Sequence, residues 1–146
     1  MALVMAGTAA WPEAGSVVLG SSLGGFYATW VAQQRRWPAV LINPAVDPAR
    51  DLATYIGEQT AFHDPAESFF FRAEYVEQLR SLTLPAARTD TALMGVFAKG
   101  DELLDWREMV ARYPGATIRL VEGSDHALSD FDNHLGAILQ FLNLSG

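Results

Sequence analysis

The sequence predicts an α/β fold in which a mainly parallel sheet is covered by helices on both faces. Short, uniformly apolar segments alternate with segments of helical periodicity, as in parallel sheets that are buried on both sides. A junction rich in glycine and serine joins the first of the apolar segments to the helix that follows it. The chain has 146 residues, of which 50% are hydrophobic, enough for one domain with a substantial core.

Four segments have the composition of short buried strands. They are Ser16–Leu19, Ala39–Ile42, Ala92–Ala98 and Thr117–Val121. Helices are expected between and after them, because apolar residues recur there at a spacing of three to four residues. The expected helices cover residues 23–36, 105–115 and 129–142. Strands and helices thus alternate along most of the chain, which favours a three-layer arrangement.

Composition and charge exclude several classes of function. The net charge of −7 and the pI near 4.8 argue against nucleic acid and against anionic membrane surfaces as partners. The chain has no cysteine and only three scattered histidines, so neither a disulfide scaffold nor a metal site is indicated. No apolar run approaches the roughly 20 residues of a membrane span. The opening MALVMAGTAAW resembles a signal peptide only faintly, since it lacks a positive n-region, and a cytoplasmic protein is expected.

One long segment interrupts the alternation within what we take as a single domain, residues 1–146. Residues 47–88 are mostly polar and too long for a plain connection, so they form a cap-like insertion. Asp47-Pro48 and Asp64-Pro65 both have the pattern of a helix start, with aspartate as N-cap and proline after it. A further helix is expected within residues 72–82. The insertion either covers the sheet or caps a pocket, and both interpretations remain open.

The glycine- and serine-rich junction matches the motif of a nucleophile elbow. Residues 20–24 read GSSLG, which fits G-x-S-x-G at a turn from strand to helix, with the central serine at its apex. Ser22 is therefore the candidate nucleophile, and the N–H of Leu23 would face the oxygen of a reacting carbonyl. Gly20 and Gly24 are expected because a Cβ at either position would clash as helix and strand converge. A tight turn without any chemistry is the alternative.

An acid and a histidine should then follow in that order, and the chain supplies both. Asp101 and Asp105 are the candidate acids, and Asp101 is preferred because it follows Gly100 at the carboxyl end of the third strand, whereas Asp105 fits a helix N-cap. His126 follows the fourth strand and would lie at the same edge of the sheet. His134, inside the last helix, is expected to be solvated or near the cap. His63, inside the insertion, is expected at the surface.

These three residues predict acyl transfer to a serine. His126 would take the proton of Ser22 as the hydroxyl attacks an ester or thioester carbonyl, and Asp101 would orient the imidazole. Water would then cleave the acyl-enzyme. This chemistry needs neither a metal nor an organic cofactor.

The chain also resembles a known family in four segments. GSSLGGFYATW, LINPAVDP, GDELLD and EGSDHALSDFD are similar to YqiA/YcfP-type α/β-hydrolases, which are small bacterial cytoplasmic esterases. The likeness runs in register from about Val17 to the end and is loosest between residues 49 and 92. It implies an α/β-hydrolase fold and a carboxylic ester hydrolase acting on small acyl esters or thioesters, and it assigns Ser22, Asp101 and His126 to the catalytic triad.

The chain departs from this family at its beginning. Such proteins open with a strand that runs into a His-Gly loop, and a further strand precedes the elbow; neither is found here, so the fold is expected to be N-terminally shortened. The loop would supply a second oxyanion N–H, and the strand would pair beside Ser16–Leu19. We therefore expect weak activity and self-association through the exposed sheet edge. The alternative function is a catalytically impaired remnant that acts as a binding or interaction module.

Overall fold

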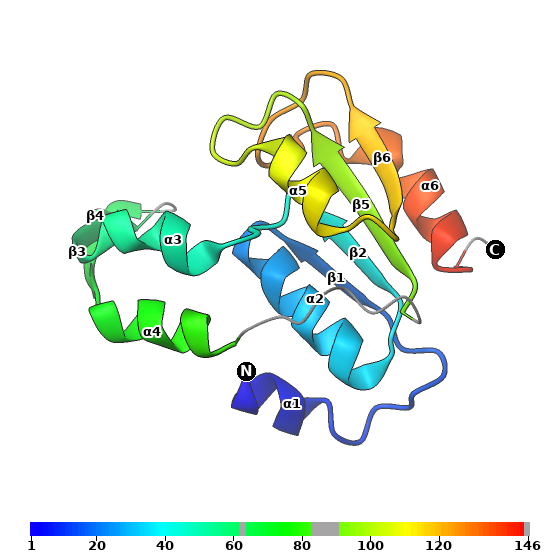
Figure 1. Ribbon diagram of the computed structural model, residues 1–146, viewed down its shortest axis with the longest axis horizontal. Coiled ribbons are helices and arrows are strands. Elements are labelled where there is room, and N and C mark those ends of the chain that lie inside the picture. The colour runs from blue at the N-terminus through cyan, green and yellow to red at the C-terminus, as the bar shows by residue number, and fades with distance from the viewer. Residues whose placement is uncertain (62–63, 83–90, 145–146) are drawn as a thin grey trace. The chain divides into compact units, whose positions relative to one another are not determined.

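A parallel sheet organises the larger part of the molecule. The computed structural model describes residues 1–61, 64–82 and 91–144. Its four-stranded sheet has the order β1, β2, β5, β6, and every neighbouring pair is parallel (Figure 1). The strands are β1 (Val18–Ser21), β2 (Ala39–Ile42), β5 (Leu93–Ala98) and β6 (Thr117–Val121). Because the strands are parallel, the residues that follow them gather at one edge of the sheet.

Different helices cover the two faces of this sheet. They are α2 (Leu23–Arg35), α5 (Trp106–Arg112) and α6 (Asp132–Phe141). Successive side chains of a strand point to opposite faces. Ala39 and Leu41 of β2 accordingly pack in one core with residues of α2 and α5, while Val40 and Ile42 pack in another with Ile138 of α6. The predicted three-layer architecture with a mainly parallel sheet is confirmed.

The first strand differs from its expected position and burial. β1 runs from Val18 to Ser21 rather than from Ser16 to Leu19, because Gly20 and Ser21 continue the register by pairing with Leu41 and Ile42. Within the described residues β1 has a strand neighbour on one side only. Leu19 is 48% exposed there, in contrast to the buried strand expected. Self-association through this edge stays a prediction.

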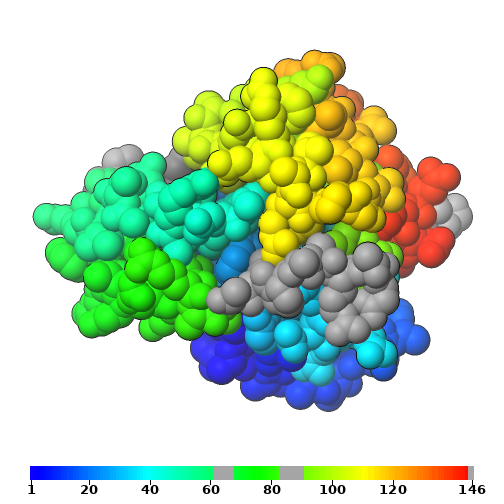
Figure 2. All heavy atoms as spheres, viewed as in Figure 1, coloured from blue at the N-terminus to red at the C-terminus, as the bar shows by residue number. Residues whose placement is uncertain are grey.

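The first residues of the chain lie against the end of α2, as Figure 2 shows for the blue and cyan segments. The short helix α1 (Ala2–Gly7) receives a hydrogen bond of 2.8 Å from Arg35 Nη2 to the carbonyl of Met5. The rings of Trp11 and Trp37 stack with centroids 6.0 Å apart.

None of the helices within the described residues is long and apolar enough to cross a membrane.

Residues 47–83 form a second compact unit. Its elements are α3 (Pro48–Leu52), a 3-10 turn η1 (Ala53–Tyr55), β3 (Gly57–Ala61), β4 (Asp64–Phe71) and α4 (Ala73–Ser81). Asp47 caps α3 by accepting a hydrogen bond from the N–H of Arg50, so this helix start is confirmed, as is the helix within residues 72–82. The interpretation of residues 47–88 as a cap-like insertion stays a prediction.

The second expected helix start in this unit was wrong. Asp64 begins strand β4, which pairs antiparallel with β3 and places Phe69 opposite Gln59 and Phe70 opposite Glu58. The strand-favouring phenylalanines and the hydrogen-bonded ladder outweigh the local Asp-Pro pattern, since proline is tolerated near the start of an edge strand. His63 and residues 83–88 of the expected insertion lie outside the described residues.

Candidate active site

Ser22 occupies a strained backbone position between β1 and α2. Its φ of 55° and ψ of −125° are unusual for a residue with a side chain, and such a conformation costs on the order of 1–3 kcal/mol. Backbone hydrogen bonds hold it: the N–H donates to the carbonyl of Ile42 at 3.0 Å, and the carbonyl accepts from the N–H groups of Gly25 at 2.9 Å, Ala45 at 3.0 Å and Phe26 at 3.4 Å. The structure thus has the sharp turn from strand to helix that the motif predicted.

The glycines around Ser22 have unequal roles. A Cβ on Gly20 would lie 2.2 Å from the carbonyl oxygen of Gly24 and 2.8 Å from Cβ of Ala28, so strand and helix could not approach as they do. A Cβ on Gly24 would meet nothing within 4 Å, and the predicted clash at this position was wrong because the first turn of α2 leaves space there. A Cβ on Gly25 would lie 2.7 Å from Cβ of Pro44. Gly20 and Gly25 are therefore the glycines that close packing requires.

This difference gives a matched pair of substitutions. We expect Gly20→Ala to lower the free energy of unfolding by about 1–3 kcal/mol or more, because backbone must move to relieve the clash. Gly24→Ala should leave it unchanged or raise it by up to about 1 kcal/mol, since alanine is the better helix former. Urea unfolding of both variants measures the effect. Equal destabilisation by the two substitutions would contradict this account of the turn.

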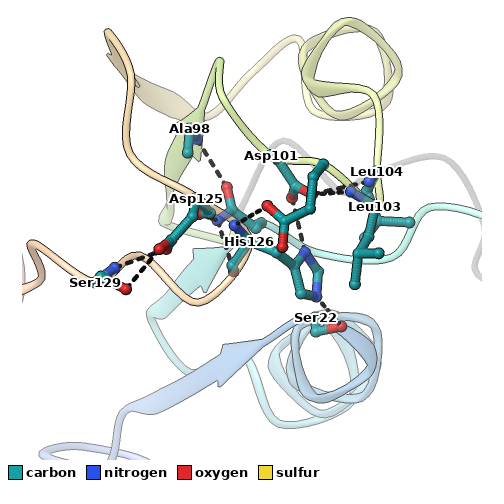
Figure 3. Close-up of polar contacts among 10 residues, drawn as sticks. Ser22, Ala98, Asp101, Leu103, Leu104, Asp125, His126 and Ser129 are labelled. Carbon is teal, nitrogen blue, oxygen red and sulfur yellow. Dashed lines mark hydrogen bonds and ion pairs between the residues drawn. The ribbon is translucent and has the colours of Figure 1, made fainter.

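The structure brings the three predicted site residues together. Nε2 of His126 lies 2.8 Å from Oγ of Ser22, and Nδ1 lies 2.8 Å from Oδ2 of Asp101 (Figure 3). The side chain of Asp101 is fully buried, and that of His126 is 16% exposed. A carboxylate only accepts hydrogen bonds, so Nδ1 carries the proton of the neutral ring and Nε2 accepts from the serine hydroxyl. The arrangement can remove a proton from Ser22.

The two candidate acids have separate positions. Oδ1 of Asp101 accepts from the N–H groups of Leu103 at 2.8 Å and Leu104 at 2.9 Å, which leaves Oδ2 for His126. Asp105 is the N-cap of α5, and its carboxylate accepts from the N–H of Arg107 at 2.9 Å. The sequence interpretation preferred this assignment of the two residues. It rested on two arguments, that side chains after parallel strands meet at a common edge and that Asp105 fits a helix N-cap.

Two residues that the sequence analysis did not single out hold the loop of His126. Glu102 accepts a hydrogen bond of 3.0 Å from the backbone N–H of His126. Asn43 donates to the backbone carbonyls of Asp125 and His126. Asn43 directly follows β2, so the signal that selected Asp101 and His126, a polar residue in the segment after an apolar strand, could also have found Asn43.

Carboxylates on the same loop are stabilised in their ionised form. The hydroxyl and the N–H of Ser129 donate to Asp125 and hold its pKa below the ordinary value of 3.8. The hydroxyl of Ser124 and then the imidazole of His134 lower the pKa of Asp130. Because both pKa values fall on folding, these contacts stabilise the loop above the ordinary aspartate pKa. The contribution is lost as the pH falls through the lowered values.

His134 matches one of its two expected environments. It lies in the first turn of α6, near the cap, and it is 5% exposed rather than solvated; its Nδ1 accepts from Nε of Arg119 at 3.1 Å. Its Nε2 lies 3.0 Å from Oδ2 of Asp130. The surface position expected for His63 falls on a residue outside the described part of the chain. His134 thus bonds to Arg119 and Asp130, and it is not part of the hydrogen-bonded chain that joins Ser22, His126 and Asp101.

Two further observations concern what the candidate site could bind. Leu23 is the first residue of α2, so its N–H has no acceptor within the helix and is available to a ligand. Within the described residues no group of three or more histidine, cysteine, aspartate or glutamate side chains is placed to hold a metal ion.

Comparisons with known proteins agree with this fold. A model of the uncharacterised protein family UPF0227 matches residues 6–143. A candidate hydrolase from Agrobacterium vitis S4 superposes with a TM-score of 0.69 at 22% identity, over 86% of this chain and 60% of its own. The α/β hydrolase domain-containing protein 10 from mouse gives a TM-score of 0.70 at 16% identity, over 97% of this chain and 67% of its own.

The esterase domain of a Rhodothermus marinus protein gives a TM-score of 0.61 at 17% identity, over 97% of this chain and 64% of its own. The present chain therefore spans about three fifths to two thirds of the length of these structures. At such identities the likeness establishes the fold. The α/β-hydrolase fold and the family resemblance expected from the sequence are both confirmed.

Proposed function

The chain belongs to the uncharacterised protein family UPF0227, and we propose that it is a serine hydrolase that cleaves carboxylic esters or acyl thioesters. One observation carries the proposal: the hydrogen-bonded chain from Oγ of Ser22 through the ring of His126 to Asp101, with both contacts at 2.8 Å. A nucleophile, a base and a group that orients the base are the parts that acyl transfer to serine requires.

In the proposed first step, Oγ of Ser22 attacks the carbonyl carbon of the substrate while Nε2 of His126 takes the hydroxyl proton. The imidazolium that forms is stabilised by the carboxylate of Asp101, which also keeps the proton of Nδ1 in place. The tetrahedral intermediate collapses as the bond to the alcohol or thiol breaks. His126 returns its proton to this leaving group, and Ser22 remains acylated.

The second step repeats this chemistry with water as the nucleophile. His126 removes a proton from the water, the hydroxide attacks the acyl carbon, and the acid leaves as the proton returns to Oγ of Ser22. In both steps negative charge develops on the carbonyl oxygen. The N–H of Leu23, at the positive end of α2, is the proposed donor to this oxygen.

Several structures of the same fold support ester hydrolysis by analogy. Besides the Rhodothermus esterase domain, they include a carboxylesterase from Nitrososphaera gargenis, with a TM-score of 0.51, and a monoacylglycerol lipase from Paleococcus ferrophilus, with a TM-score of 0.57. The family resemblance further supports a bacterial cytoplasmic enzyme with a small acyl substrate.

Pre-steady-state kinetics test the proposal. With p-nitrophenyl butyrate we expect a burst of nitrophenol that approaches one equivalent per chain, followed by slower turnover, because an acyl-enzyme accumulates. His126→Ala should abolish the burst, and a short acyl thioester should compete for the same site. Folded protein without burst or turnover would contradict the proposal and would favour the alternative, a catalytically impaired binding or interaction module.

A further inference from the structure

Asn43 is a buried polar residue at the edge of the sheet where the candidate site lies. It directly follows β2, is fully buried, and has a positive φ of 39°. Its backbone N–H donates to the carbonyl of Val96 at 3.2 Å, which fixes its position beside β5. A buried amide in an uncommon backbone conformation is costly unless its polar atoms are all paired.

The side chain of Asn43 satisfies its polar atoms by joining the end of β5 to the histidine loop. Its Oδ1 accepts from the N–H of Ala98 at 2.8 Å, and its Nδ2 donates to the carbonyls of Asp125 at 3.0 Å and His126 at 2.9 Å. Ala98 ends β5, and its own carbonyl accepts from the N–H of Asp101 at 3.3 Å. Asn43 therefore links the segment that leads to the acid with the segment that carries the histidine.

We propose that Asn43 is a positioning residue that holds the imidazole of His126 in line between Ser22 and Asp101. This inference rests on the proposed function. The carbonyls of residues 125 and 126 are fixed by Asn43 from one side, while Glu102 holds the N–H of His126 at 3.0 Å from the other. Because both polar groups of its backbone are held, His126 is kept in the conformation that places Nε2 2.8 Å from Oγ of Ser22. No other loop conformation has to be given up before the reaction.

The chemistry of asparagine suits this role in a way that other residues of similar size do not. Its amide supplies two donors and one acceptor, which match two carbonyls and one N–H. Aspartate has the same shape and keeps the acceptor toward Ala98, but it offers no hydrogen for the carbonyls of Asp125 and His126. Asn43→Asp therefore separates the contact with the histidine loop from the contact with β5.

We expect Asn43→Asp to lower kcat on p-nitrophenyl butyrate on the order of 10²-fold with a much smaller change in KM, because a displaced catalytic group slows chemistry more than binding. The low-field proton resonance of Nδ1 of His126 should be present in the wild-type protein and be lost or broadened in the variant. Asn43→Ala should give the same result, since it also lacks both donors. Kinetic rates are to be compared per folded molecule.

Thr29→Val is the matched control. Thr29 is fully buried; its hydroxyl donates to the carbonyl of Gly25 at 2.8 Å and bonds to the hydroxyl of Tyr113 at 3.0 Å, so this variant loses buried polar contacts away from the histidine loop. It should destabilise the fold yet keep kcat and the His126 resonance. A folded Asn43→Asp protein with unchanged kcat and an unchanged His126 resonance would overturn the inference. Wild-type protein that shows the resonance without turnover would overturn the proposed function instead.

Discussion

Replacing Ser22 by alanine is expected to reduce ester turnover on the order of 10⁶-fold. The substitution removes the oxygen that forms the acyl-enzyme and leaves the ring of His126 without a nucleophile to activate. Steady-state hydrolysis of p-nitrophenyl butyrate measures the loss. The fold should survive, because the backbone hydrogen bonds of residue 22 do not involve its side chain.

Ser21→Ala is the control for this result. Ser21 is the adjacent serine at the end of β1. The Ser21→Ala variant should retain much of the wild-type turnover. Comparable losses in the two variants would mean that the turn, rather than the hydroxyl of Ser22, limits activity. A large loss in Ser21→Ala alone would exchange the roles of the two serines and contradict the proposed elbow.

Asp101→Asn should reduce kcat by about 10⁴-fold, because an asparagine in contact with Nδ1 favours the wrong tautomer of His126. Oδ2 of Asp101 is 2.8 Å from Nδ1 in the present structure, and the side chain is fully buried. The same variant should keep a wild-type fold by circular dichroism. In Asp101→Asn the wrong tautomer of His126 would therefore lower the activity much more than the stability.

Asp105→Ala should show the opposite behaviour. The carboxylate of Asp105 accepts the N–H of Arg107 at 2.9 Å as the N-cap of α5, and its loss should cost about 1 kcal/mol of stability with little change in kcat. Thermal unfolding and turnover are to be measured on both variants. If Asp105→Ala loses the activity and Asp101→Asn loses only stability, Asp105 is the acid and the proposed triad is wrong.

The layers of the fold and the residues of the candidate site could be predicted from local signals. Uniformly apolar segments such as Ala39–Ile42 indicate strands that are buried on both faces, and polar residues directly after them gather at one edge. Asp101 and His126 were found in this way, and the structure brings both to Ser22. The assignment depends on the order of the elements and not on knowledge of the packing.

Features that depend on three-dimensional neighbours could not be predicted in the same way. The helical pattern does not show that the inner side of α6 holds His134 against Arg119. The motif does not show that a Cβ would fit at Gly24 and not at Gly20. At Asp64 the local pattern of a helix start was outweighed by antiparallel pairing with the preceding strand β3, because the Asp-Pro pattern does not show this ladder of hydrogen bonds.

The central claim is that Ser22, activated by His126, is the nucleophile, and covalent labelling tests it most directly. A fluorophosphonate probe, followed by proteolysis and mass spectrometry, should place one adduct per chain on Ser22, and His126→Ala should greatly slow the reaction. An adduct on Ser21 or on any other residue would contradict the claim. So would labelling at an undiminished rate in folded His126→Ala protein.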